Sequence, residues 1–207
     1  MNGTIADVPR CTAFIGHSCA ASGTQLQVAL AVKALLAHDA KAQILIFNDE
    51  TGAQIDFDLR GSDEEISARL RRLAPKPEEE AAMRGPGRPK LGVVAREVTL
   101  LPRHWEWLAE QPGGASVTLR KLVEEARRAS AFADAGRKSQ ERAYRFMSAI
   151  AGDFAGFEEA ARALFASDRQ RFNELVAAWP GDVRDHAVRL AFKTAGQGQP
   201  GGQAIAR

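Results

Sequence analysis

"QILIFNDETGAQIDFDL", residues 43–59, decides the fold of the N-terminal part of the chain. Four consecutive apolar residues are typical of a buried strand, and "DETG" is typical of a turn. In the following stretch Ile55, Phe57 and Leu59 alternate with polar residues, so they share one face of a second strand. The sequence therefore predicts a β-hairpin with one buried face and one face in solvent.

Further elements are indicated on both sides of this hairpin. "CTAFIG" is typical of a strand, and "SGTQLQVALAVKALLAHD" has apolar residues at helical spacing, with Ser22 or Thr24 as the N-cap. After the hairpin, Ser62 and Glu65 have the spacing of a capping box, so "DEEISARLRRL" is expected to be a helix. Residues 1–73 are therefore predicted to form a small β-α-β-β-α unit.

The C-terminal part is predicted to be a helical bundle over residues 136–194. Three amphipathic stripes have the period of helices that bury one face, and they are separated near Ser167 and near Gly181 or Asp182. The stripes consist of Phe154, Phe157, Ala161, Leu164 and Phe165, then Phe172, Leu175, Val176 and Trp179, and then Val183, Ala187, Leu190 and Ala191. These elements place the protein in the α+β class, and the glycine-rich residues 195–207 are expected to be a disordered tail.

Composition indicates a globular protein with a hydrophobic core. Hydrophobic residues make up 45% of the 207 residues, but no apolar run approaches the roughly 20 residues of a membrane span. The N-terminus lacks the cationic start and apolar stretch of a signal peptide. We therefore expect a cytoplasmic protein that does not bind a membrane.

No set of residues typical of a metal, cofactor or catalytic site stands out. Cys11, His17 and Cys19 lack the Cys-x2-Cys spacing of zinc sites, and the two thiols are expected to be buried. Carboxylates gather around the hairpin, at Asp49, Glu50, Asp56 and Asp58, as they do on solvated surfaces, and they form no calcium loop. The sequence has no Walker loop and no serine elbow, so an enzyme is not expected. The alternative of an enzyme that acts on a nucleotide in residues 1–73 rests on fold analogy alone.

Positive charge is concentrated in the middle of the chain. The formal net charge is +2, yet residues 84–145 contain 13 Lys and Arg against 7 Asp and Glu. The stretch 74–92, which overlaps the start of this basic region, contains four prolines and changes from acidic to basic. This composition indicates a linker. This asymmetry favours an anionic polymer as partner, and a merely solvated surface is the alternative.

Within that linker, "RGPGRPKLG" resembles the core of an AT-hook, an arm that lies in the minor groove of DNA. The resemblance rests on Gly-Arg-Pro flanked by cations, and it covers Arg84, Gly87, Arg88, Pro89 and Lys90. It implies that Arg88 enters a narrow A·T-rich groove, while Arg84 and Lys90 contact phosphates. The alternative is a plain tether between two folded parts.

The next segment, residues 93–135, is expected to be a strand-helix-helix segment, and its residues 94–128 resemble the ribbon-helix-helix repressors. A strand from Val94 to Leu101 is followed by a helix beginning at Pro102, a "QPGG" turn, and a helix of a dozen residues that Ser116 caps. The buried face of this second helix is expected to be the stripe Leu119, Leu122, Val123 and Ala126. The resemblance implies that two chains pair their strands into a ribbon in the major groove and that the second helix binds a phosphate at its N-terminus. The alternative is that the strand joins the N-terminal sheet.

Nearly the whole chain also resembles a family of bacterial cytoplasmic proteins that is defined only as a domain of unknown function. The resemblance runs from "TAFIG" through "IFNDETGAQIDFDLRG" and "GRPKLGVVAREVTLLPRHWEWLAEQPGGASVTLRKLVEEAR" to "GFEEAARALF" and "WPGDVRDHA". It implies no activity, so the functional argument rests on the residues themselves.

The sequence favours a non-enzymatic DNA-binding protein, either a transcriptional regulator or a nucleoid-associated factor. It is expected to prefer A·T-rich duplexes and to form a homodimer, without a cofactor or metal. Besides the arm, the expected contact residues are Arg96, Arg103, Ser116, Arg120, Lys121, Arg127 and Arg128. The alternative is a protein-binding adaptor or assembly module in which the basic middle is only solvated.

Overall fold

The computed structural model describes residues 10–73, 94 and 96–192. The chain divides into two compact units, which are described separately. The sheet unit combines residues 1–72 with residues 135–207, and the middle unit comprises residues 73–134. In the described part of the chain, no helix is long and apolar enough to cross a membrane. The expected linker 74–92 and tail 195–207 lie outside the described residues.

The sheet unit is built on a four-stranded antiparallel sheet with the strand order β2-β1-β3-β4. The strands are β1 (Arg10–Ile15), β2 (Ser18–Thr24), β3 (Ile44–Asn48) and β4 (Gln54–Ile55). β3 and β4 form the predicted hairpin, with Ile46 opposite Ile55. The regular strand stops at Ile55, but Phe57 and Leu59 keep the predicted alternation and pack on the same cluster as Ile55.

β2 is the element that the sequence did not predict. Residues 18–24 pair with β1, and the register shifts at a bulge between Ala13 and Phe14. The small side chains of residues 18–24 lack the alternating apolar pattern of a predicted strand. The N-terminal order is therefore β-β-α-β-β-α instead of the expected β-α-β-β-α. Of the two candidate caps, Thr24 caps α1 (Gln25–His38) through a capping box with Gln27.

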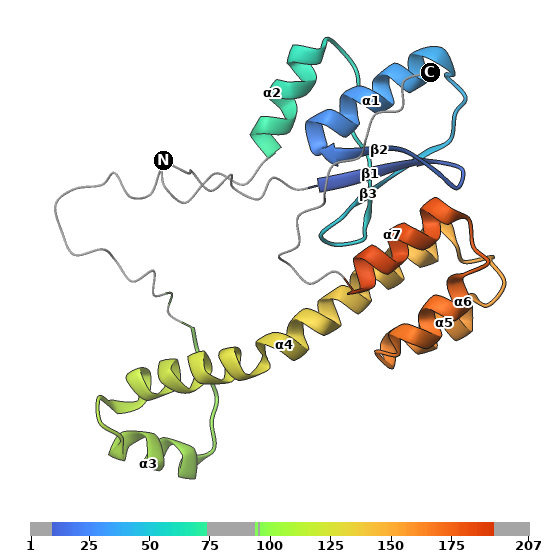
Figure 1. Cartoon of the computed structure of the whole chain (residues 1–207). Coiled ribbons are helices and arrows are strands. Elements are labelled where there is room, and N and C mark those ends of the chain that lie inside the picture. Colours follow the sequence, from blue (N-terminus) through green and yellow to red (C-terminus); the bar gives the residue numbers. More distant parts are fainter. Residues whose placement is uncertain (1–9, 74–93, 95, 193–207) are drawn as a thin grey trace, which may run out of the picture. The chain divides into compact units, whose positions relative to one another are not determined.

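One face of the sheet is covered by α1 (Figure 1). The shared core consists of Cys11, Ala13, Val28, Val32 and Ile46. After β4, α2 (Asp63–Leu73) begins as predicted, because Ser62 and Glu65 exchange the two hydrogen bonds of a capping box.

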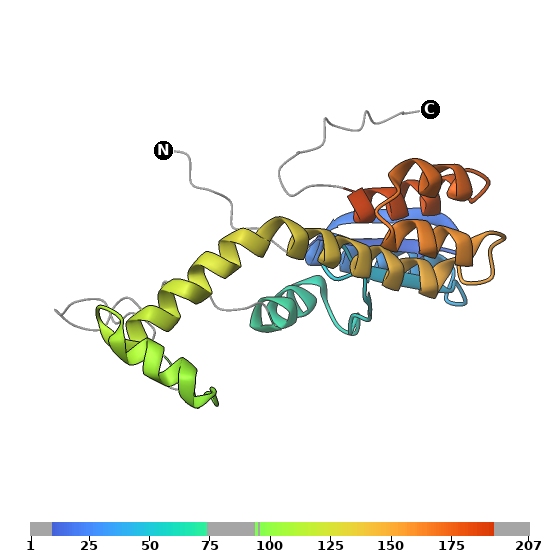
Figure 2. The same cartoon turned by 90° about the horizontal axis from the view of Figure 1, so that it is seen from below.

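The opposite face of the sheet packs on helices from the second half of the chain, which lie in front of the sheet in Figure 2. Together with α1 on the other face, they give the unit three layers (Figure 1). Phe14 and Phe47 point to this face and contact Phe146 in the last turns of α4 (Gly114–Ile150). The three predicted C-terminal helices are present as α5 (Phe157–Phe165), α6 (Arg169–Val176) and α7 (Gly181–Phe192). The α+β class is thereby confirmed.

The middle unit differs from the expected strand-helix-helix segment. Residues 94 and 96–101, which belong to the expected strand 94–101, do not have strand conformation. α3 (Pro102–Glu110) begins with proline in its first turn, as predicted. α4 is 37 residues long instead of a dozen and runs through the expected boundary between residues 135 and 136, because the lone Gly136 does not interrupt it.

Candidate functional site

The expected nucleic-acid contacts divide into an arm and a helical part. The arm, Arg84 to Lys90, lies outside the described residues. The other seven residues are all exposed, namely Arg96, Arg103, Ser116, Arg120, Lys121, Arg127 and Arg128. All seven belong to the middle unit.

Ser116 does not have the role that the sequence suggested. α4 begins at Gly114, so Ser116 lies inside the first turn and is not the N-cap. Its carbonyl oxygen accepts a hydrogen bond from the Arg120 Nε at 3.1 Å. The two glycines that precede it, Gly113 and Gly114, have positive φ values of 90° and 72°, which allow the chain to turn from α3 into α4.

The cations of α4 differ in how far they are already neutralised. Arg127 and Arg128 both donate to the Glu124 carboxylate at 2.9 to 3.0 Å, and the hydrogen bond from Arg127 lowers the pKa of Glu124. By contrast, Arg120 and Lys121 form no ion pair with any residue that the structure describes. Of these four side chains, Arg120 and Lys121 therefore have the charge most available to an anionic ligand.

The middle unit also exposes apolar side chains. Of residues 94 and 96–134, only Leu108 is buried. The stripe expected to be the buried face of the second helix is open, since Leu122 is 42% and Val123 is 64% exposed. The prediction that this stripe is buried is therefore wrong for the residues that the structure describes. Trp105 and Trp107 of α3 are also almost half exposed.

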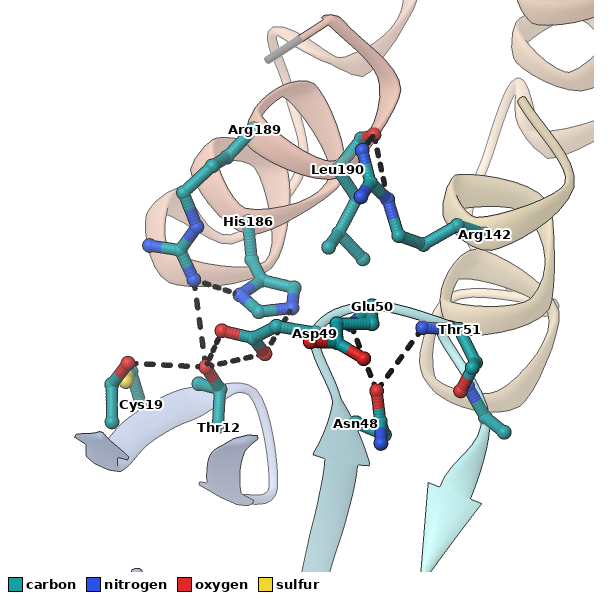
Figure 3. A network of polar contacts seen from close by, with 12 residues as sticks. Thr12, Cys19, Asn48, Asp49, Glu50, Thr51, Arg142, His186, Arg189 and Leu190 are labelled. Carbon is teal, nitrogen blue, oxygen red and sulfur yellow. Dashed lines mark hydrogen bonds and ion pairs between the residues drawn. The ribbon is translucent and has the colours of Figure 1, made fainter. Parts of the chain in front are cut away.

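A second group of polar residues lies in the sheet unit, between α7 and the sheet, where Thr12 and His186 are buried and Asp49 and Arg189 are partly buried (Figure 3). The Thr12 hydroxyl, on β1, donates to both Asp49 carboxylate oxygens, at 2.9 and 3.2 Å. Arg189 of α7 donates to Nδ1 of His186 and approaches the Thr12 hydroxyl to 3.5 Å. We call Thr12, Asp49, His186 and Arg189 the polar cluster.

The geometry of the polar cluster fixes the protonation state of His186. Since Nδ1 accepts from Arg189, the proton of the neutral ring is on Nε2. This nitrogen lies 3.7 Å from the nearer Asp49 oxygen, too far for a hydrogen bond, and it has no other partner among the described residues. Burial, and then the nearby positive charges of Arg189 and Arg142, lower the pKa of His186 to about 3. The histidine is therefore neutral at physiological pH.

Burial acts on the other titratable members of this region in the opposite direction. It raises the pKa of Asp49, an effect opposed by the hydrogen bond from Thr12. It also raises the pKa of the buried Cys11 thiol to about 12. Cys19, expected to be buried, is exposed, and burial of part of its side chain raises the pKa of its thiol as well. Both thiols therefore stay protonated, which argues against a thiolate nucleophile.

The polar cluster has the character of a structural tie. It links strand β1, the turn after β3 and helix α7, and Arg142 adds two hydrogen bonds to the Leu190 carbonyl near the end of α7. Within the described residues, no group of three or more His, Cys, Asp or Glu has the arrangement of a metal site. Sequence reasoning noted Asp49 only as a solvated carboxylate and missed its partner His186, because the two residues are far apart in the chain.

Comparison with known proteins adds the family. The model of a family described as "Uncharacterized protein conserved in bacteria (DUF2239)" matches residues 10–191. The chain belongs to this family. The match covers both the polar cluster and the exposed helices of the middle unit, and it confirms the broad resemblance noted in the sequence. No curated protein and no solved structure shows detectable similarity to the chain.

Proposed function

We propose that the protein binds double-stranded DNA through the middle of its chain, as a transcriptional regulator or nucleoid-associated factor in the bacterial cytoplasm. The observation that carries the proposal is that Arg120 and Lys121 are exposed and form no ion pair with the described residues. Arg96 and Arg103 are exposed in the same way. Cations of this kind lose little on binding a phosphate, because no internal carboxylate has to be displaced.

The sequence of the arm supplies the second support. Gly87, Arg88 and Pro89 resemble an AT-hook, which implies insertion of Arg88 into a narrow A·T-rich minor groove. Arg84 and Lys90 would contact the phosphates on either side. The arm gives a preference for A·T-rich sequence, and the helix cations add affinity that is independent of sequence.

The proposal is tested by fluorescence anisotropy with A·T-rich and G·C-rich duplexes at two salt concentrations. Six to eight phosphate contacts give a slope of log affinity against log salt of about −5 to −7. The double variant Arg88→Ala/Lys90→Ala is expected to lose the A·T preference, and Arg120→Ala/Lys121→Ala to lower affinity for both duplexes. The matched control is Arg71→Ala/Arg72→Ala, which removes two exposed cations of α2 in the sheet unit. A shallow salt slope, or equal losses in all three variants, contradicts the proposal.

A protein-binding adaptor or assembly module is the second candidate function. It is favoured by the exposed apolar side chains of the middle unit, which a DNA backbone would not cover. The same anisotropy titration separates the two functions. For an adaptor, the Arg88→Ala/Lys90→Ala variant and the unmodified protein are expected to give the same result with A·T-rich duplexes.

A further inference from the structure

Glu124 lies at the centre of the basic side of α4. At 3.6 residues per turn, four cations fall within about 120° of the helix circumference, namely Arg120, Lys121, Arg127 and Arg128. Glu124 falls in the middle of this sector, about one turn after the first two cations and one turn before the last two. A shallow hollow on the surface of α4 joins the carboxylate to three of the cations, since its lining includes Arg120, Lys121, Glu124 and Arg128.

The Glu124 carboxylate occupies donors of two of these cations. Arg127 donates through Nη2 to Oε1 at 2.9 Å and through Nε to Oε2 at 3.0 Å, and Arg128 donates through Nε to Oε1 at 3.0 Å. The three side chains are exposed, with 42% of Glu124, 72% of Arg127 and 76% of Arg128 open to solvent. A ligand can therefore reach both the carboxylate and the guanidinium groups that it holds.

We infer that Glu124 is an internal competitor of DNA phosphates, which holds Arg127 and Arg128 in the free protein and releases them when a duplex binds. The inference rests on the proposed function and adds a residue that regulates the same site. A phosphate offers a guanidinium the same pair of acceptor oxygens as a carboxylate, so the two anions compete for the same donors. Water weakens exposed ion pairs, so a duplex that presents many phosphates can displace a single carboxylate.

The competition divides the four cations into two pairs. Arg120 and Lys121 form no ion pair with the described residues, so they can contact phosphates without displacing a carboxylate. Arg127 and Arg128 contribute fully only after their hydrogen bonds to Glu124 are given up. The displaced carboxylate then lies among phosphates of like charge, which is unfavourable. Glu124 therefore lowers affinity for every duplex sequence, because phosphate contacts carry no base information.

Glu124→Gln in the full chain tests the inference by the anisotropy titration. Glutamine keeps the length of the side chain but removes its charge. Affinity for both the A·T-rich and the G·C-rich duplex is expected to rise about ten-fold at about 100 mM salt, and the salt slope to steepen by up to about 2, at about 0.9 for each added phosphate contact. Glu125→Gln is the matched control, because Glu125 is exposed and forms no ion pair with the described residues. It is expected to raise affinity less than about three-fold and to leave the slope unchanged.

A double-mutant cycle shows whether Glu124 acts through the two arginines. In the background Arg127→Ala/Arg128→Ala, Glu124→Gln is expected to raise affinity less than about three-fold, because no held cation remains to be released.

Three results overturn the inference while the unmodified protein keeps a steep salt slope, so that the proposed function stands. They are equal effects of Glu124→Gln and Glu125→Gln, a ten-fold gain that persists without the two arginines, and weaker binding of Glu124→Gln to the G·C-rich duplex, as expected of a carboxylate that accepts from cytosine. A shallow slope in the unmodified protein instead overturns the proposed function, and this inference with it.

Discussion

The buried His186 should make the stability of the sheet unit depend on pH in the mildly acidic range. Its pKa is about 3 in the folded protein and 6.5 in the unfolded chain. Between these values the unfolded state binds more protons, so stability is fully present above pH 6.5 and is lost as the pH falls toward 3. The loss approaches 1.4 kcal/mol for each pH unit, which amounts to about 2 kcal/mol at pH 5.

Asp49 contributes with the opposite sign. Its pKa is raised on folding, so the folded state takes up the proton first and gains stability as the pH falls toward the unfolded value of 3.8. Because Asp49 is present both in the unmodified protein and in a variant that lacks only His186, the difference between the two proteins reports on His186.

The assay is urea unfolding at pH 7.5, 6.0 and 5.0 for the unmodified protein and for His186→Phe. The ring of His186 packs edge-on against Phe14 and at a tilt against Phe146, so phenylalanine keeps an aromatic ring in place but removes the titration. The variant is expected to lose less stability between pH 7.5 and 5.0 than the unmodified protein, by about 2 kcal/mol. His38→Phe, at the exposed end of α1, controls for the loss of a histidine as such. Equal pH dependence of the unmodified protein and His186→Phe would refute the reasoning.

Two further predictions concern packing and backbone conformation in the sheet unit. Phe146 is fully buried between Phe14, Phe47 and His186. Phe146→Ala is therefore expected to lower the free energy of unfolding by about 3–5 kcal/mol in the same urea assay. A loss below about 1 kcal/mol would contradict this packing. Gly52 has a φ of 68°, and a Cβ at this position would lie 1.9 Å from the Arg142 carbonyl oxygen. Gly52→Ala is therefore expected to lower the midpoint temperature of thermal unfolding by several degrees. The control Gly136→Ala, in α4 with open space around it, should leave the midpoint unchanged or raise it.

Local patterns predicted the elements that depend on local physics. Alternation placed Ile55, Phe57 and Leu59 on one face, because successive side chains of an extended chain point to opposite sides. The Ser62 and Glu65 pair located the start of α2 for a similar reason, since its hydrogen bonds form within four residues.

Long-range contacts account for what the sequence did not predict. β2 exists because β1 pairs with it, and nothing in its small residues indicates a strand. Asp49 was interpreted as a solvated carboxylate, and it lies beside the buried His186 only because α7 packs on the sheet near Thr12. The stripe at Leu122 and Val123 was predicted as buried from its period, but a period shows only that a face is apolar and not whether another element covers it.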